Sequence, residues 1–201
     1  MKPVTDISQL DFNKQYTYAD YLTWQFSERV ELIKGWIHKM SPAPKRIHQE
    51  MSRRLEVQID NYLKNKNCKV YHAPFDVRLI RNIGQKNREI QTVIQPDICV
   101  ICDLEKLDDL GCLGAPDWII EILSKSSMKT DEVDKFQLYE ENNVREYWIV
   151  DVENCIIKAY LLNTKKEKYE LVNYYSNNEK NIPVGIFPDL KFDYDTLFKD
   201  L

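Results

Sequence analysis

Three apolar runs constrain the fold of this chain more than any other feature of its sequence. Residues 94–102, 117–123 and 145–152 have the sequences IQPDICVIC, DWIIEIL and REYWIVDV. Short, nearly continuous apolar runs of this kind are typical of strands buried within a sheet. A helix is predicted over about 130–142, between the last two runs. Strands joined through a helix in this way indicate an α/β fold with a mixed sheet.

Local patterns predict the remaining elements. Thr17 has the chemistry of an N-cap and begins a short helix, and residues 29–33 and 36–40 alternate around Lys34-Gly35 as a β-hairpin does. The other expected elements are a long amphipathic helix over 45–65, strands at 69–72 and 75–81, a C-terminal β-meander to about residue 190 and a short tail at 194–201. No repeat or linker divides the chain, so residues 1–201 are expected to form one domain.

Composition excludes several classes of protein. The 5 glycines form none of the glycine-rich phosphate-binding or nucleophile motifs. No apolar run approaches the roughly 18 residues of a membrane span, and the first ten residues lack the apolar core of a secretory signal. We therefore expect a cytoplasmic protein without a membrane partner. Its 5 cysteines, which show no framework spacing, are then expected to stay reduced.

Charge is distributed unevenly along the chain. The net charge is −4, but residues 42–91 hold 11 Lys or Arg against 5 acids, which leaves +6 there and −10 elsewhere. An enzyme that handles phosphodiesters can use cations for the backbone of its substrate and carboxylates for a metal ion. Two solvated charged faces explain the same distribution, and charge alone does not separate the two interpretations.

Two carboxylates interrupt the apolar runs. Asp97 follows Pro96, and Glu121 lies in the middle of the run at 117–123. A carboxylate in such a strand is costly unless it is hydrogen-bonded, paired or bound to a metal. Oxygen ligands without thiolate or imidazole favour Mg²⁺ or Mn²⁺. The other interpretation is that each acid caps a strand end or pairs with a lysine.

These residues also carry a resemblance to a known family. Pro96-Asp97 followed by Glu121 resembles the P-D…(D/E)-x-K signature of the PD-(D/E)XK nuclease superfamily, and the closer match is its Uma-type restriction-endonuclease family. The matching segments, in chain order, are Glu31–Gly35, Met40–Pro44 with His48, Gln95–Ile98, Gly114–Ser124, and Asp131…Lys135…Tyr139 leading to Glu146–Asp151. The resemblance implies a restriction-endonuclease-like mixed β-sheet core flanked by helices, with an N-terminal hairpin and a C-terminal β-meander.

The same resemblance implies a mechanism. Asp97 and Glu121 would hold Mg²⁺ or Mn²⁺, the main-chain carbonyl of Ile122 would complete the metal site, and Glu31 would join it from the hairpin. The implied activity is hydrolysis of DNA by a metal-activated water, as a restriction-type endodeoxyribonuclease that often acts as a homodimer. The metal lowers the pKa of the water and neutralises charge on the phosphate.

The chain departs from the superfamily pattern at the lysine. Leu123 stands two residues after Glu121, where the pattern has Lys, so the ammonium must come from elsewhere. In the Uma-type family it has moved to the next helix, which points to Lys135. Asp131, Lys135 and Tyr139 share one stripe of that helix, so an ordinary Asp131–Lys135 surface pair is the competing interpretation. Lys125 is a rival source of the ammonium, because it shares face parity with Glu121.

Phosphate contacts are expected on the basic helix and on the loop that follows it. The candidates are His48, Lys45, Arg46, Arg53 and Arg78. His48 could instead orient a carboxylate, or simply pack.

Two other functions compete with the nuclease. Cys99, Cys102 and Cys112 could bind zinc or act in redox chemistry, but residues three apart in a strand face opposite sides. A catalytically inactive nuclease-like fold that binds nucleic acid or protein is the other alternative, and Leu123 is its best support.

Overall fold

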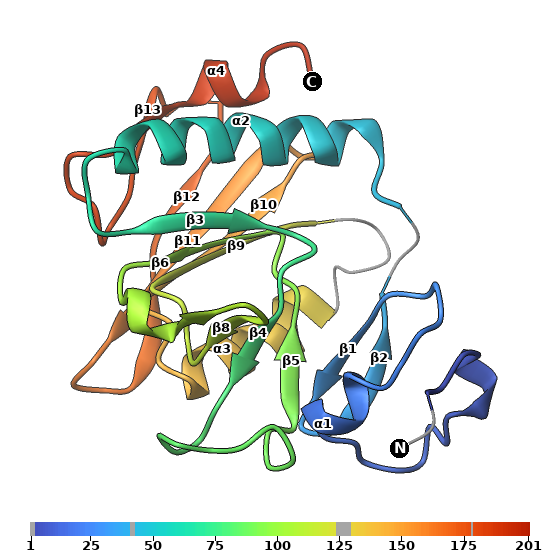
Figure 1. Cartoon of the computed structure of the whole chain (residues 1–201). Helices are drawn as coiled ribbons and strands as arrows, with labels where there is room; N and C mark the ends of the chain where they lie inside the picture. The colour runs from blue at the N-terminus through green and yellow to red at the C-terminus, as the bar shows by residue number, and fades with distance from the viewer. Residues whose placement is uncertain (1–2, 41–42, 124–129, 178) are drawn as a thin grey trace.

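Two six-stranded sheets form the centre of the fold in the computed structural model, which describes residues 3–40, 43–123, 130–177 and 179–201 (Figure 1). The first, here called the hairpin sheet, has the strand order β2 (Trp36–Lys39), β1 (Val30–Ile33), β5 (Thr92–Ile94), β4 (Val77–Leu79), β8 (Gly111–Leu113) and β7 (Leu107–Asp108). The second, the core sheet, has the order β12 (Lys168–Tyr175), β11 (Ile156–Asn163), β10 (Glu146–Asp151), β9 (Trp118–Ile122), β6 (Ile98–Ile101) and β3 (Lys69–His72).

The core sheet is mixed. β9 and β10 are parallel, and the other neighbouring pairs in this sheet are antiparallel. A parallel pair needs a crossover, which here contains a π-helical turn, Thr130–Lys135, followed by α3 (Phe136–Glu141). The α/β fold with a mixed sheet that the apolar runs predict is therefore confirmed.

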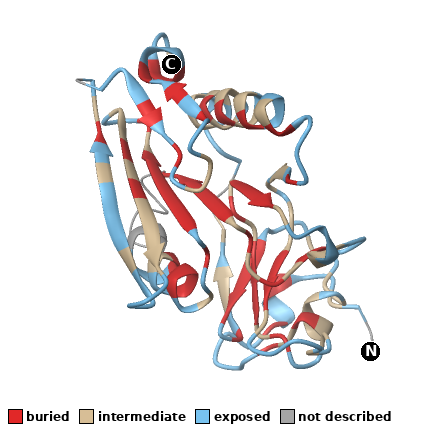
Figure 2. Cartoon of the chain, turned by 90° about the vertical axis from the view of Figure 1, so that its left-hand side faces the viewer, coloured by how far each residue is buried: buried red, intermediate tan, exposed pale blue. Residues whose placement is uncertain are grey.

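Helices cover the core sheet on both faces. α2 (Arg46–Leu63) lies across one face and buries Met51, Leu55, Ile59 and Leu63, which are four residues apart and so share one side of the helix (Figure 1). The C-terminal hairpin β13 (Asn181–Pro183) and β14 (Lys191–Asp193), with α4 (Tyr194–Phe198), packs beside it. Leu138 and Tyr139 of α3 pack on the opposite face. Figure 2 shows the buried strands between these layers.

The N-terminal segment packs against the hairpin sheet. It contains the 3₁₀ turn Ile7–Gln9 and α1 (Tyr18–Tyr21), and a further 3₁₀ turn, Leu104–Lys106, precedes β7. Thr17 caps α1 in a reciprocal pair of hydrogen bonds with Asp20, as the sequence predicts. Lys34 and Gly35 have positive φ angles of 52° and 87° and turn the chain between β1 and β2. The predicted hairpin is thus present.

The run at 94–102 is not one strand. It divides into β5, in the hairpin sheet, and β6, in the core sheet, and residues 95–97 lie between the two. Pro96 explains the break, because it has no N–H to donate to a ladder. The chain therefore passes from one sheet to the other immediately before Asp97.

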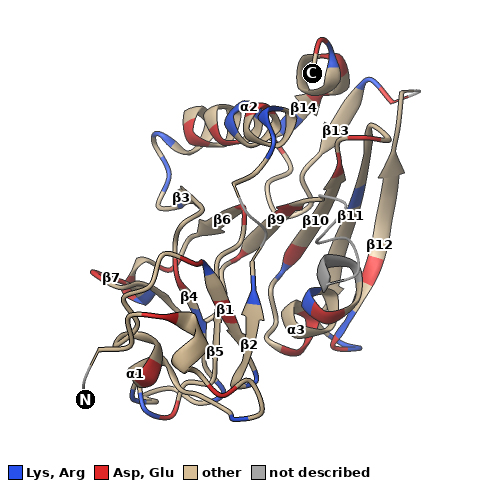
Figure 3. Cartoon of the chain, turned by 90° about the vertical axis from the view of Figure 1, so that its right-hand side faces the viewer, with Lys and Arg blue, Asp and Glu red and all other residues tan. Residues whose placement is uncertain are grey.

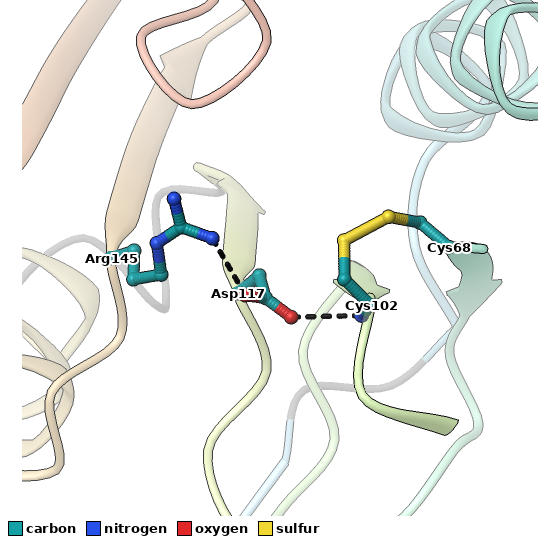
Figure 4. The surroundings of a disulfide bond; sticks show 4 residues. All are labelled: Cys68, Cys102, Asp117 and Arg145. Carbon is teal, nitrogen blue, oxygen red and sulfur yellow. Dashed lines mark hydrogen bonds and ion pairs between the residues drawn. A yellow bond between two sulfur atoms is a disulfide. The ribbon is translucent and has the colours of Figure 1, made fainter. Parts of the chain in front are cut away.

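The cysteine prediction is wrong for two of the five residues. Cys68 and Cys102 form a disulfide with an S–S distance of 2.09 Å (Figure 4). They continue the antiparallel register of β3 and β6, in which Lys69 pairs with Ile101, so pairing of the strands places the two cysteines opposite each other. Asp117 supports the same corner, since it accepts hydrogen bonds from the Cys102 N–H and from Arg145 at 2.8 and 3.0 Å.

A search for membrane spans among the described residues finds no helix with the length and apolar character needed to cross a bilayer.

Candidate active site

Four of the predicted side chains meet where the two sheets adjoin. Glu31 comes from β1 of the hairpin sheet, and Glu121 comes from β9 of the core sheet. Asp97 stands just before β6, and Lys135 ends the π-helical turn of the crossover. Residues 104 positions apart in the chain, Glu31 and Lys135, are thereby brought into direct contact. Two features of the fold bring these residues together: the interruption between β5 and β6 at Pro96, and the crossover between β9 and β10.

The Lys135 ammonium bridges two buried carboxylates. Its Nζ lies 2.9 Å from Glu121 Oε1 and 3.2 Å from Glu31 Oε1. All three side chains are almost inaccessible, with exposed fractions of 3% for Glu121, 5% for Glu31 and 6% for Lys135. Burial of these charges is tolerable only because the one ammonium is in hydrogen-bonded contact with both carboxylates. A pair at the surface, the competing interpretation for Lys135, is incompatible with this burial.

Two residues of the competing interpretations cannot be placed. Lys125 lies outside the described residues, and so does the side chain of Asp131.

Tyr139 is a fifth member of the cluster. Its hydroxyl donates to Glu121 Oε1 at 2.6 Å, from a position one helical turn after Lys135. Burial, together with the negative charge of Glu121, holds the pKa of Tyr139 well above its usual range, so the phenol remains a hydrogen-bond donor. The helical stripe that joins Lys135 and Tyr139 in the sequence is the signal that finds this residue.

Asp97 contacts the buried Glu121 and is itself partly exposed to solvent. Its Oδ2 accepts a hydrogen bond from the Ile122 N–H at 2.8 Å and lies 3.2 Å from His48 Nε2, while its own N–H donates to Glu121 Oε2 at 3.3 Å. The Asp97 side chain is 23% exposed, in contrast to the nearly buried Glu121. The cluster is therefore accessible from the side of Asp97 and His48, and closed on the side of Lys135.

The main-chain carbonyl of Ile122 is expected to point toward Asp97. Within a strand the N–H and C=O of one residue point to the same side, so the Ile122 carbonyl, like its N–H, points toward the Asp97 side. The printed pairing of β6 with β9 begins at Ile98 and Ile120, so Ile122 lies beyond the paired residues.

This donor set has the chemistry of a magnesium or manganese site. Mg²⁺ prefers oxygen ligands and is usually held by one or two carboxylates, with waters and substrate phosphates completing its shell. Asp97, Glu121 and the Ile122 carbonyl supply oxygens of that kind on one side of the cluster. Over the part of the chain that the structure describes, no three His, Cys, Asp or Glu side chains are arranged to share one ion. For such an ion the described residues offer the carboxylates of Asp97 and Glu121 together with the Ile122 carbonyl.

The zinc or redox alternative does not fit. Cys102 is bonded to Cys68, and Cys99 is buried on the other face of the strand, as residues three apart should be. Burial is the main cause that raises the pKa of the Cys99 thiol and raises the pKa of Cys112 to about 12, so neither thiol is poised to form a thiolate.

The predicted phosphate contacts divide into two groups. Lys45, Arg46 and Arg53 are exposed on or next to α2, which carries both basic and acidic residues along its length (Figure 3). Arg53 also forms an ion pair with Glu50 at 2.7 Å. Arg78, in contrast, is 2% exposed, contacts Asp108 and lies over the Tyr18 ring, so its guanidinium is directed inward. The prediction that Arg78 contacts phosphate is therefore incompatible with its position.

Comparisons with known proteins agree with this fold. A crystal structure described as "a putative nuclease belonging to DUF820", from Anabaena variabilis ATCC 29413, is similar with a TM-score of 0.68 and 19% identity, over 90% of this chain and 97% of that one. An "Uncharacterized protein slr1290" from Synechocystis sp. (strain ATCC 27184 / PCC 6803 / Kazusa) is 24% identical over 186 residues, 90% of each chain.

A family model gives the most specific result. The model named Uma2, described as "Putative restriction endonuclease", matches residues 18–195. That range contains both sheets and all the cluster residues described above, from Glu31 to Tyr139. The resemblance inferred from the sequence motifs is therefore confirmed, and the chain belongs to the Uma2 family.

Proposed function

We propose that this protein is an endonuclease that hydrolyses DNA phosphodiester bonds with Mg²⁺, or Mn²⁺, as its cofactor. The observation that carries the proposal is the contact between Lys135 and Glu121 at 2.9 Å. The nuclease pattern has a lysine two residues after the second acid, but this chain has the buried Leu123 at that position. Lys135, from the crossover between β9 and β10, brings an ammonium to Glu121 in its place. Membership of the Uma2 family supports the same reaction.

Asp97, Glu121 and the Ile122 carbonyl would hold the ion. When bound, the ion would polarise a phosphate oxygen and make a coordinated water acidic. The chain's own groups do the remaining work. The Ile122 N–H and His48 fix the Asp97 carboxylate, and the Tyr139 hydroxyl fixes Glu121. Lys135, held between Glu31 and Glu121, would stabilise the negative charge that develops on the attacking oxygen.

DNA would approach along the beginning of α2. His48 lies in the first turn of this helix and contacts Asp97, so the beginning of the helix borders the accessible side of the cluster. Lys45 and Arg46 are exposed within one turn of His48, and Arg53 is exposed farther along α2. Cations beside a metal site would hold the phosphates that flank the scissile bond.

The test compares the wild type with Asp97→Asn and with the matched control Glu170→Gln. Both variants remove one carboxylate charge, but Glu170 is exposed on β12 and pairs with Lys166, far from the cluster in the sequence and on the edge strand of the sheet. Each protein is incubated with supercoiled plasmid in Mg²⁺, Mn²⁺ or EDTA, after circular dichroism has shown that it folds. We expect nicking or linearisation by the wild type and the control, only with metal, and none by Asp97→Asn.

Other outcomes would contradict the proposal. Equal traces of cleavage in all three proteins indicate a contaminating nuclease. If no protein cleaves plasmid or single-stranded DNA, and Asp97→Asn binds DNA as tightly as the wild type or more tightly, the fold acts as a binding module instead.

A further inference from the structure

We infer that Gln95 is a positioning residue for the carboxylates of the metal site, an inference that rests on the proposed function. Gln95 stands in the break between β5 and β6, two residues before Asp97. Gln95 begins the matching segment Gln95–Ile98, but the family pattern there specifies only the Pro-Asp that follows it, and its amide is neither a carboxylate nor a cation. Its contacts in the fold are what assign it this role.

The main chain of Gln95 reaches two acids of the cluster. Its N–H donates to Glu31 Oε1 at 2.8 Å, the same oxygen that contacts Lys135. On its other side, only Pro96 separates it from Asp97, and the fixed φ of proline leaves little freedom in that link. A displacement of Gln95 would therefore move the donor that holds Glu31 and the backbone that carries Asp97.

The side chain of Gln95 is held at both ends of its amide. Oε1 accepts hydrogen bonds from Arg29 Nη2 and Nε at 2.7 and 3.2 Å. Nε2 donates to Asp76 Oδ1 at 2.9 Å and lies 3.2 Å from the Tyr21 hydroxyl. The acceptor end thus meets a cation and the donor end meets an anion, which fixes the orientation of the amide.

Asp76 is itself held by hydrogen bonds from two tyrosines of α1. It accepts hydrogen bonds from the hydroxyls of Tyr18 and Tyr21, at 3.2 and 3.4 Å. Burial, and then the charge of Asp76, raise the pKa of both phenols above their ordinary value, so both remain donors. The chain of contacts runs from α1 through Asp76 and Gln95 to Glu31 and Asp97.

Only an amide of this length satisfies both neighbours. A carboxylate at position 95 would still accept from Arg29, but it would oppose the Asp76 carboxylate across a contact that is now a hydrogen bond. The polarity of that single contact can also be reversed, by giving position 76 the amide and position 95 the carboxylate. This reversal separates the proposed role from a general requirement for glutamine.

The experiment measures Gln95→Glu, Asp76→Asn and the double variant, with Gln137→Glu as the control. Gln137 is exposed on α3, so it carries the same chemical change without the network. Binding of Mn²⁺ is titrated by electron paramagnetic resonance, and kcat and KM are measured on plasmid DNA. For Gln95→Glu we expect weaker Mn²⁺ binding and a kcat lower by about 10²-fold, the effect of a displacement near 1 Å, with KM unchanged. The double variant should recover at least about tenfold of that loss, because the hydrogen bond is restored in the opposite sense.

Each alternative result has a definite meaning. Unchanged Mn²⁺ affinity and kcat in folded Gln95→Glu, or a double variant no better than the single one, would overturn the positioning role. If Gln95→Glu does not fold, Gln95→Met is measured instead, with the same expected split between kcat and KM. A wild type that neither binds Mn²⁺ nor cleaves DNA contradicts the proposed function itself, before any Gln95 variant is considered.

Discussion

Two buried glutamates on neighbouring strands have different surroundings. Taken over the whole residue, Glu121 on β9 and Glu146 on β10 have exposed fractions of 2% and 1%. Glu121 meets the ammonium of Lys135 and the hydroxyl of Tyr139, next to the accessible Asp97. Glu146 accepts hydrogen bonds from the Trp148 indole and from the N–H groups of Gly185 and Ile186, at 2.7, 3.0 and 2.8 Å.

The difference teaches that burial of a carboxylate does not by itself mark a reactive site. The donors around Glu146 are neutral, and two of them belong to the loop after β13, so this carboxylate fastens that loop to the core sheet. Glu121 instead belongs to a group of charged side chains, with Lys135 and Glu31, beside the partly exposed Asp97. The partners of an acid, and its access to solvent through them, separate a structural role from a chemical one.

The largest expected effect tests the charge balance around Glu121. Lys135→Met should lower the free energy of unfolding by about 3–5 kcal/mol, because it leaves two buried carboxylates without their shared cation. Urea denaturation measures the change. Lys166→Met is the control: Lys166 pairs with Glu170 on the exposed hairpin of β11 and β12, so its removal should leave the unfolding midpoint unchanged. Equal midpoints for both variants would show that Lys135 is not the buried counter-ion.

The same substitution at the two glutamates should separate activity from stability. Glu121→Gln should reduce metal-dependent cleavage by about 10²–10³-fold, in the range found when one preorganised group is lost. Glu146→Gln should cost about 1–3 kcal/mol of stability, because its NH₂ group cannot accept the hydrogen bond that the lost oxygen accepted, while cleavage is retained. A plasmid assay and urea denaturation of both variants make the comparison. Loss of cleavage in a folded Glu146→Gln variant would contradict the purely structural role of Glu146.

Glu146 also predicts a pH dependence of stability. Burial is the main cause that raises the pKa of Glu146 above 4.5, so the native state retains a proton that the unfolded state has released. The stability contributed by this group is therefore fully present below pH 4.5 and is lost as pH rises through the higher pKa of the folded state. The difference in unfolding free energy between wild type and Glu146→Gln, followed over this range, should show that slope. A difference that is constant with pH would contradict it.

The smallest effect is expected outside both carboxylate sites, on α2. Arg46→Ala should weaken DNA binding modestly and reduce the salt slope of the affinity by about one unit, as expected for one lost phosphate contact. Fluorescence anisotropy at several salt concentrations measures the slope. Lys166→Ala, on the β11–β12 hairpin, should leave it unchanged, and an equal change in both variants would argue against a DNA-binding surface on α2.

The main helices and strands of the fold were largely predictable from the sequence, whereas the interruption of a strand and the shortest strands were not. The hairpin, α2 and the buried strands follow from alternation and helical spacing, which reflect which face of each element is buried. The division of the run at 94–102 between two sheets depends on where β5 and β6 find partners. The short strands β7 and β8 carry too few residues to show a period, and their pairing is likewise decided by neighbours far away in the chain.

For the candidate site, an acid within an apolar run identifies Glu121 but does not exclude acids that have other roles. An acid within an apolar run describes Glu146 as well as Glu121, and only the resemblance to the nuclease signature distinguishes them. Lys135 and Tyr139 could be proposed because they share a helical stripe. Gln95 and the Cys68–Cys102 pair could not be found, because their roles depend on contacts with Arg29, Asp76 and a partner strand that no local spacing encodes.

The disulfide divides the proposed metal ligands topologically. Residues 68 to 102 form a covalent ring, closed across a separation of 34 residues, and Asp97 and Gln95 lie inside it. Glu31, Glu121 and Lys135 lie on the two open arms of the chain. Closing a ring of this size removes conformational entropy from the unfolded chain equivalent to about 4 kcal/mol. A reductant would thus release the ring without altering any of the proposed metal ligands, so we expect it to change how readily the site assembles and to leave the chemistry of the assembled site unaltered.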